Sequence, residues 1–155
     1  MNKKASGIKI IAVNRKIRHY MEILETLEAG IALTGPEVKS LRAGKVSFKE
    51  GYVEFRRGEA FLVGVHIATY ENVGYAAHDP VRPRKLLLHK GEIERLRGKV
   101  EQKGLTVVPN KMYFKEGKAK VEIALARGLR LHDRRAALKR KAVERDMARE
   151  MAKYK

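Results

Sequence analysis

The chain has 155 residues, of which 44% are hydrophobic, enough for one folded domain with an extension. It carries 35 Lys and Arg against 18 Asp and Glu, and this formal net charge of +17 favours a polyanionic partner. The absence of cysteine excludes disulfides, thiolate metal sites and cysteine nucleophiles.

The first third of the chain predicts two strands and a short helix. Residues Ile8 to Asn14 are rich in β-branched side chains, and Met21 to Gly35 alternates apolar with polar positions, so both favour strands. We expect Gly30 to form a bulge or bend in the second strand. Pro36 suits a first helical residue and Gly44 a left-handed stop, which predicts a short helix between them.

The middle of the chain predicts a hairpin, a loop and a helix. Tyr52 to Tyr70 alternates around the turn sequence RRGE, as a hairpin does. The following stretch, ENVGYAAHDPVRPRK, contains Gly, two Pro and mixed charges, so an irregular loop is expected. Between Leu86 and Gly104, the residues Ile93, Leu96 and Val100 recur at helical spacing, which predicts a helix ending at the glycine.

The last part of the chain predicts a second hairpin, LTVVPNKMYFKEGKAKVEIALARG, that turns at KEGK. The order of elements favours a mainly β fold, a small closed antiparallel OB-like barrel with flanking helices, because closure removes exposed strand edges. A two-layer α+β sandwich is the alternative. We expect the barrel to occupy residues 1–128 and a separate basic tail to occupy residues 129–155.

The tail differs from the rest of the chain. From Leu129 onward it holds ten Lys and Arg against four Asp and Glu, with no Gly or Pro. Val143, Met147 and Met151 follow one another at intervals of four residues and form a narrow apolar stripe. A segment with high helix propensity and little surface to bury is expected to be helical only beside a partner, such as a phosphate-lined channel.

No targeting or membrane segment is evident. The N-terminus lacks the apolar run of a signal peptide, and no stretch approaches the roughly 18 apolar residues of a membrane span. Together with the lack of cysteine, this favours a cytoplasmic location. No membrane partner is expected.

Catalysis is poorly supported by the residue types. The chain has three Asp, three Ser and five scattered His, and no Glu pair has a spacing that catalysis would require. We therefore expect no enzymatic activity, catalytic residue, cofactor or metal site. A metal-dependent RNA-processing enzyme that uses Glu or His is kept as an alternative to the two binding hypotheses given below.

Basic residues gather in two segments that suit phosphate contact, although a solvated surface would show the same pattern. Few aromatic residues, 6% and no Trp, argue against base stacking along single strands, so structured RNA is the preferred partner. The first segment supplies Lys39, Arg42 and Lys45, and the second supplies Arg82, Arg84, Lys85, His89 and Lys90.

Three segments closely resemble the SsrA-binding protein family, also called small protein B. They are RKIRHYMEILETLEAGIALTGPEVKSLRAGKVSF, HDPVRPRKLLLHKGEIERLRGKVEQKGLTVVP and LARGLRLHDRR. The resemblance runs from about Asn14 into the tail. It implies an OB-like barrel that binds the elbow of the tRNA-like domain of tmRNA, the RNA of bacterial trans-translation.

The resemblance also implies which positions face the RNA. Glu28 would bond a base or a 2′-hydroxyl rather than neutralise phosphate, and Leu87 would make an apolar contact. The implied positions are His19, Glu28, Lys39, Arg42, Lys85, Leu87, His89 and Lys90.

For the tail, the resemblance implies a segment that is unstructured when free. On a stalled ribosome it would become a helix in the vacant mRNA channel, beyond the decoding centre. This chain departs from the family pattern at Leu129, which stands where the family has a lysine. The tail positions implied to act at the decoding centre and channel are Gly128, Arg130, His132, Asp133, Arg134, Arg135, Lys139, Arg140 and Lys141.

Two binding hypotheses follow. The first is a non-enzymatic adaptor, monomeric when free, whose partners are tmRNA and the stalled ribosome. The second is a general RNA-binding or ribosome-associated protein without specificity for tmRNA. The first predicts that binding survives competition by unrelated structured RNA, and the second predicts that it does not.

Overall fold

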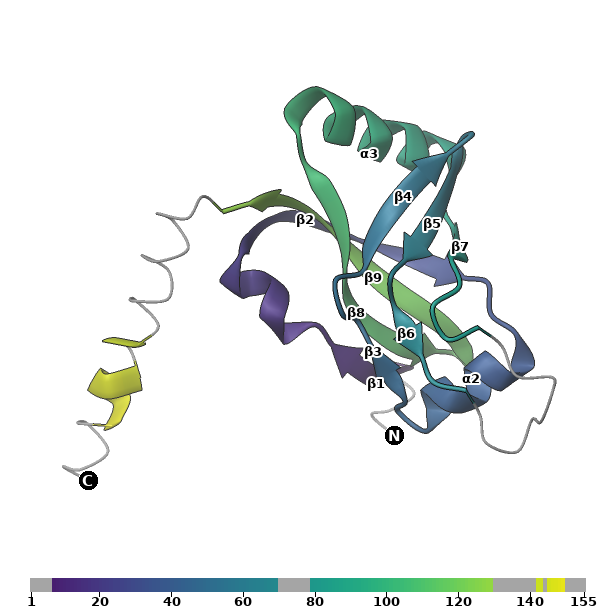
Figure 1. The fold of residues 1–155 in the computed structure, drawn as a ribbon, viewed down its shortest axis with the longest axis horizontal. Coiled ribbons are helices and arrows are strands. Elements are labelled where there is room, and N and C mark those ends of the chain that lie inside the picture. Colours follow the sequence, from purple (N-terminus) through teal and green to yellow (C-terminus); the bar gives the residue numbers. More distant parts are fainter. Residues whose placement is uncertain (1–6, 70–78, 130–141, 144, 150–155) are drawn as a thin grey trace.

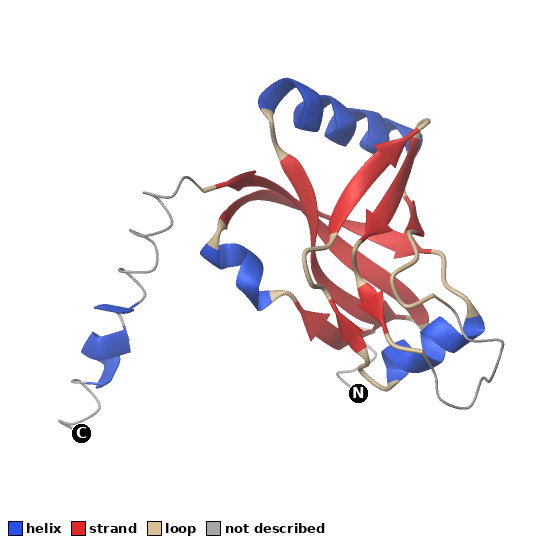
Figure 2. Ribbon diagram, in the orientation of Figure 1, coloured by secondary structure: helices blue, strands red, loops and turns tan. Residues whose placement is uncertain are grey.

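The computed structural model describes residues 7–69, 79–129, 142–143 and 145–149. Within these residues, an antiparallel seven-stranded sheet is the main element (Figure 1), and its strand order is β1-β8-β9-β2-β7-β5-β4. Strands dominate over helices (Figure 2), so the mainly β prediction is confirmed. The hydrogen-bonded order has two ends, β1 (Ile8–Val13) and β4 (Tyr52–Arg56), so the prediction of a closed barrel is not confirmed.

Three long strands form the centre of the sheet. They are β2 (Met21–Ile31), β8 (Thr106–Lys115) and β9 (Lys118–Gly128). Strands β8 and β9 pair as the hairpin that KEGK predicts, and that prediction is confirmed. Strand β2 lies on the other side of β9, so residues far apart in sequence share one surface.

Of the bulge or bend predicted at Gly30, the bulge is wrong. The register of β2 against β9 shifts between Ile23 and Glu25, whereas Gly30 pairs regularly with Lys120 on β9 and with Leu87 on β7 (Arg84–Leu87). A Cβ at Gly30 would lie 3.1 Å from the Cβ of Leu87, so the glycine is explained by the close approach of β7.

The predicted short helix is confirmed as α2 (Gly35–Arg42). Thr34 precedes it and forms a capping box with Glu37: the Glu37 amide donates to Thr34 Oγ1 at 3.4 Å, and the Thr34 amide donates to Glu37 Oε1 at 2.9 Å. Gly44 has φ +72° just beyond the helix, the left-handed conformation expected of a stop. The 3₁₀ helix η1 (Arg15–His19), between β1 and β2, was not predicted.

The first hairpin is shorter than predicted. Strand β4 pairs with β5 (Glu59–Val63), and the chain then leaves the sheet at Gly64, where φ is +80°. The next residues form the short strand β6 (His66–Ile67), which pairs with β3 (Val46–Ser47) in a separate two-stranded sheet.

The prediction of loop and helix across residues 84–87 is wrong. These residues form strand β7 (Arg84–Leu87), which lies between β2 and β5. The helix starts later, as α3 (Lys90–Lys103), and ends at Gly104 in the left-handed conformation. Residues 71–78 of the predicted loop, and Tyr70 before it, lie outside the described residues.

The larger core cluster joins buried strand residues to both α-helices, and a smaller one packs Ile17 of η1 against Val108 of β8 and Ala124 and Ala126 of β9. Leu41 of α2 and Leu96 of α3 are 1% and 2% exposed and pack against the buried strand residues. In the described part of the chain, no helix is long and apolar enough to cross a membrane. The described tail residues, 142–143 and 145–149, are helical, and Val143 and Met147 are exposed among them.

Candidate nucleic-acid interface

Strand β7 presents two different faces. Its side chains alternate strictly, so Arg84 and Leu86 are buried, while Lys85 and Leu87 are exposed. The exposed side chains open onto a groove of about 660 Å³ that reaches the start of α3. Its lining combines five predicted RNA-facing residues: Glu28, Lys85, Leu87, His89 and Lys90.

The groove holds both charged and apolar groups. Lys85 Nζ lies 2.6 Å from Glu59 Oε2, and both side chains are about half exposed. Such a pair contributes little to stability and can exchange partners with a ligand. Lys90 forms no ion pair with any described residue, and Leu87, 56% exposed, adds an apolar surface. The backbone amide of His89 donates to Glu92 Oε1 at 2.9 Å at the start of α3.

Glu28 stands at the edge of the groove on β2. Its Oε2 accepts a hydrogen bond from the Tyr113 hydroxyl and lies 3.5 Å from Lys115 Nζ. The bond from Tyr113 outweighs partial desolvation and, with Lys115 and Lys120 nearby, holds the pKa of Glu28 below its ordinary value. Glu28 is therefore an anion in a groove of mixed charge, whose lining holds Glu59 and Glu92 as well as Lys85, Lys90 and Lys120.

Sequence reasoning missed four residues of this surface: Glu59, Tyr113, Lys115 and Lys120. Lys120 lines the groove from β9, and it lies opposite both Gly30 on β2 and Tyr113 on β8. The alternation of Lys118, Lys120 and Glu122 with apolar residues marks one solvent-facing side of that strand. Only the register, however, places that side next to Glu28.

Arg84 does not belong to this surface. Its side chain is 0% exposed, and Nε donates to Glu37 Oε2 at 2.8 Å. The other donors reach backbone carbonyls, at 2.8 Å for Val65 and 3.1 Å for Pro80. A buried guanidinium with these partners cannot reach an RNA phosphate, so the assignment of Arg84 to phosphate contact is corrected to a structural role.

The carboxylate that pairs with Arg84 is also buried. Glu37 is 0% exposed, and Arg82 donates to it at 2.6 Å (Nη2) and 3.0 Å (Nε). Burial alone would raise the pKa of Glu37, but hydrogen bonds from Arg82, the Thr34 amide and Arg84 lower it to about 2. The hydrogen bonds from Arg82 and Arg84 to Glu37 therefore link α2 to β7.

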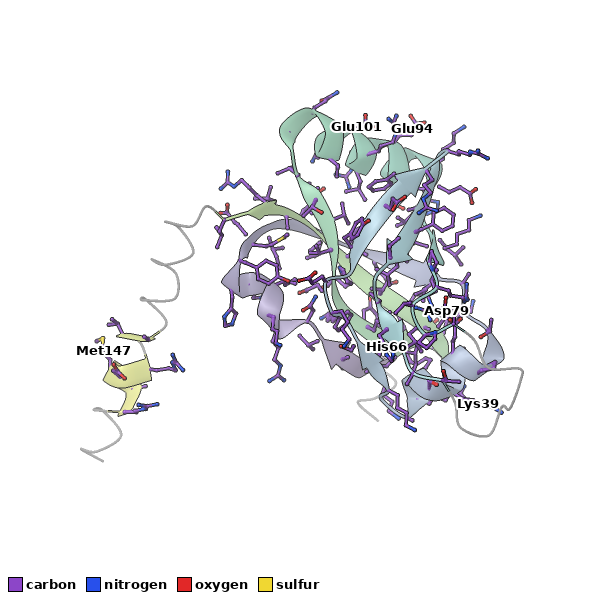
Figure 3. All side chains as sticks on the ribbon, in the orientation of Figure 1. Lys39, His66, Asp79, Glu94, Glu101 and Met147 are labelled. Atoms are coloured by element: carbon purple, nitrogen blue, oxygen red, sulfur yellow. The ribbon has the colours of Figure 1, made fainter. Side chains whose placement is uncertain are left out.

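The basic residues of α2 and of the turn that follows it lie away from the groove. Lys39, Arg42 and Lys45 are exposed, and the Arg42 guanidinium lies 5.8 Å from the centroid of the Phe114 ring. In Figure 3, Lys39 marks α2 at one end of the sheet, and Glu94 and Glu101 mark α3 at the other. The sequence-predicted cations therefore form two groups.

His19 is a third, separate position. It ends η1 and is exposed, and the carbonyl of the next residue, Tyr20, accepts from the amide of Leu129 at 2.9 Å. Gly128 is the last residue of β9, so His19 lies where the tail leaves the sheet. The other predicted tail positions lie outside the described residues: Arg130, His132, Asp133, Arg134, Arg135, Lys139, Arg140 and Lys141.

The groove offers several kinds of binding contact. Among the described residues, no group of three or more His, Asp or Glu side chains could hold a metal ion. Exposed lysines can neutralise phosphates, Leu87 can contact a base or sugar face, and Glu28 can accept from an N–H or O–H donor. These are the kinds of contact that a folded RNA offers.

Comparison with known proteins agrees with the residue-level resemblance. Residues 11–153 match the family model described as SmpB protein. The SsrA-binding protein of Solidesulfovibrio magneticus is 62% identical over 154 residues, which cover 99% of this chain and 100% of the relative. The SsrA-binding protein of Nostoc punctiforme is 55% identical over 155 residues, again 99% of this chain and 100% of the relative.

A solved structure is also similar. It is described as "tmRNA-SmpB: a journey to the center of the bacterial ribosome", and its matching chain is 57% identical to this one. The match covers 83% of this chain and 94% of that chain, with a TM-score of 0.68.

Proposed function

This chain belongs to the SmpB family of SsrA-binding proteins, and on that premise we propose that it binds tmRNA and delivers it to stalled ribosomes. The observation that carries the proposal is the groove, where Glu28, Lys85, Leu87, His89 and Lys90 lie together although β2 and β7 are far apart in sequence. In this function the protein is an adaptor of trans-translation without catalytic activity of its own.

Each type of side chain in the groove has its own part in binding. Lys85 and Lys90 contact phosphates as mobile point charges, and Leu87 packs against a sugar or base. His89 contacts a base or a phosphate, while Glu28 accepts a hydrogen bond and repels phosphate. The mixture favours the shape of one folded RNA over simple attraction to any polyanion.

The remaining predicted contacts extend this surface. Lys39 and Arg42 on α2, and Lys45 just after it, lie beyond the other end of β7, and His19 lies near the start of the tail. A tRNA-like domain bent at its elbow is large enough to touch more than one of these positions. The protein would then occupy the place of the missing anticodon arm.

We further propose that residues 1–128 act as an RNA-binding body and residues 129–155 as a ribosomal probe. A helix of about 20 residues extends roughly 30 Å. Placed in a vacant mRNA channel, the ten Lys and Arg of the tail would be attracted to the phosphates that line it. The tail then reports the absence of mRNA.

Three smaller proposals complete this account. Strand β4 lies close to β8 without pairing to it, so the sheet would complete an OB-like barrel by side-chain packing at this seam. The free protein is proposed to be a monomer, and it acts in the cytoplasm, where ribosomes translate.

Competition binding tests the proposed function. The full-length protein is titrated into the labelled tRNA-like domain of tmRNA at near-physiological salt, with excess unrelated structured RNA present. We expect tight binding to persist. If the competitor removes it, the net charge of +17 accounts for the binding, and the protein is a general RNA-binding protein.

Deletion of residues 129–155 tests the proposal that residues 1–128 bind RNA and the tail acts on the ribosome. The truncated protein should keep its affinity for the tRNA-like domain and lose peptide tagging on stalled ribosomes. A full-length variant carrying Arg134→Glu and Arg135→Glu should lose tagging as well, which controls for any effect of truncation on the body. Tagging by the truncated protein at the full-length rate would contradict the probe mechanism.

A further inference from the structure

The two carboxylate oxygens of Glu28 differ in their surroundings. Oε2 accepts from the Tyr113 hydroxyl and lies near Lys115 Nζ, as described above. Oε1 has no hydrogen-bonding partner among the described residues, and the side chain is 36% exposed. One oxygen is therefore held by the protein, and the other is open to a ligand in the groove.

Tyr113 is well suited to hold Glu28 in place. It lies on β8, two strands away from β2, and its register partner on β9 is Lys120, which also lines the groove. The side chain is 5% exposed, so the ring is fixed by packing and only the hydroxyl reaches the carboxylate. Burial, reinforced by the bond to Glu28, raises the pKa of Tyr113, so the hydroxyl keeps its proton and remains a donor.

We infer that Tyr113 is a positioning residue for RNA recognition: its hydroxyl fixes the Glu28 carboxylate in one orientation, so that Oε1 faces a hydrogen-bond donor of the RNA. The donor is a base N–H or a ribose 2′-hydroxyl, and not a phosphate. The inference rests on the proposed function, because it concerns the same groove.

A positioning residue is needed here because several cations surround Glu28. Lys115 is within 3.5 Å, and Lys120 is close enough to lower the pKa of Glu28. A glutamate without the Tyr113 bond could rotate toward either lysine. RNA binding would then have to fix the side chain in one orientation, and this loss of conformational entropy would lower the affinity. The neighbouring carboxylate, Glu122, lies opposite Glu28 and is engaged separately by Asn110 Nδ2 at 2.6 Å.

A double-mutant cycle tests the coupling directly. Affinity for the tRNA-like domain is measured for the full-length protein with Tyr113→Phe, with Glu28→Ala and with both. We expect Tyr113→Phe to weaken binding about tenfold when Glu28 is present and less than about twofold when it is absent. An equal loss in both backgrounds, or no loss with Glu28 present, would overturn the inference.

Salt dependence separates positioning from phosphate contact. Tyr113→Phe should leave the slope of log affinity against log salt unchanged, since no cation is removed. Lys85→Gln is the matched control in the same groove, and the magnitude of its negative slope should decrease by about one. A fall for Tyr113→Phe as large as for Lys85→Gln would assign Tyr113 to phosphate binding and overturn the inference.

Titration of the free protein provides a readout that needs no RNA. Carbon-detected NMR should show a higher pKa for the Glu28 carboxyl in Tyr113→Phe than in the wild type, since the largest contribution to its lowering is removed. An unchanged pKa would overturn the inference even if RNA binding is specific. Loss of wild-type binding to competitor RNA would instead count against the proposed function.

Nucleotide substitution identifies the donor class. The RNA is made with 2′-deoxy nucleotides, or with bases that lack the exocyclic amino group or the ring N–H, and RNA binding by the wild type is compared with that by Glu28→Gln. The inference is supported by a nucleotide whose substitution weakens RNA binding by the wild type more than RNA binding by Glu28→Gln. The type of substitution then shows whether the ribose or the base is the donor. If no position in either set behaves this way, the inference is overturned.

Discussion

Arg84 and Lys85 are adjacent basic residues on one short strand, and they have opposite surroundings. Arg84 points inward, is fully buried and pairs with the buried Glu37. Lys85 points outward, is half exposed and pairs with the exposed Glu59 in a groove. Charge alone therefore does not mark an RNA contact. Successive side chains of a strand point to opposite faces of the sheet, so the position along the strand decides whether a cation stabilises the fold or faces a ligand.

The largest expected effect tests the inward face. Arg84→Met should lower the free energy of unfolding by about 3–5 kcal/mol, because it leaves the Glu37 carboxylate buried with one partner fewer. Lys85→Met, the same change one residue later, should lower it by less than about 1 kcal/mol. Chemical denaturation of both variants measures the difference. Equal losses would mean that the two faces are not distinct.

The outward face is tested by RNA affinity. Combining Lys85→Gln with Lys90→Gln should weaken binding to the tRNA-like domain and lower the salt slope by about 1.5 to 2, since two phosphate contacts are removed. Arg97→Gln combined with Lys103→Gln removes the same charge from α3 outside the groove. If this control lowers affinity and slope equally, the groove has no special part in binding.

The inward face also predicts a dependence of stability on pH. The folded pKa of Glu37, about 2, is below the ordinary value of 4.5, so the unfolded chain binds more protons between these values. The contribution of Glu37 to stability is complete above pH 4.5 and is lost as the pH falls toward 2. Denaturation midpoints measured across this window should fall more steeply for the wild type than for Glu37→Gln. Parallel curves would contradict the assignment.

The smallest effect concerns the apolar part of the groove. Leu87→Ala should weaken RNA binding about two- to fivefold, because part of an apolar contact is lost. Stability and salt slope should stay unchanged, since Leu87 is 56% exposed and carries no charge. A changed slope would mean that the substitution moves the neighbouring lysines.

The elements that could be predicted carry their signals locally. The turn KEGK and the alternating residues beside it define the second hairpin, and Pro36 and Gly44 mark the ends of α2. Strand β7 could not be predicted in this way, because Leu86 to Leu88 is a short apolar run without periodicity that stands directly before a helix. The reason for a glycine at position 30 was missed as well, because it is the close approach of Leu87 on this strand.

The candidate site divides in the same way. Lys85, His89 and Lys90 could be grouped because they are close in sequence, and Glu28 and Leu87 were added by the family resemblance. Lys120 could not be included without the register of β9 against β2. Nor could the burial of Arg84 be foreseen, because its partner Glu37 is distant in sequence and belongs to a helix.

Lysine footprinting tests the central claim, that the outward face of β7 and its neighbours binds tmRNA. The full-length protein is acetylated at limiting reagent with and without the tRNA-like domain, and each lysine is quantified by mass spectrometry. The account predicts protection of Lys85, Lys90 and Lys120, with Lys103 at the far end of α3 unprotected. Protection confined to the tail, with the groove lysines as reactive as in the free protein, would contradict it.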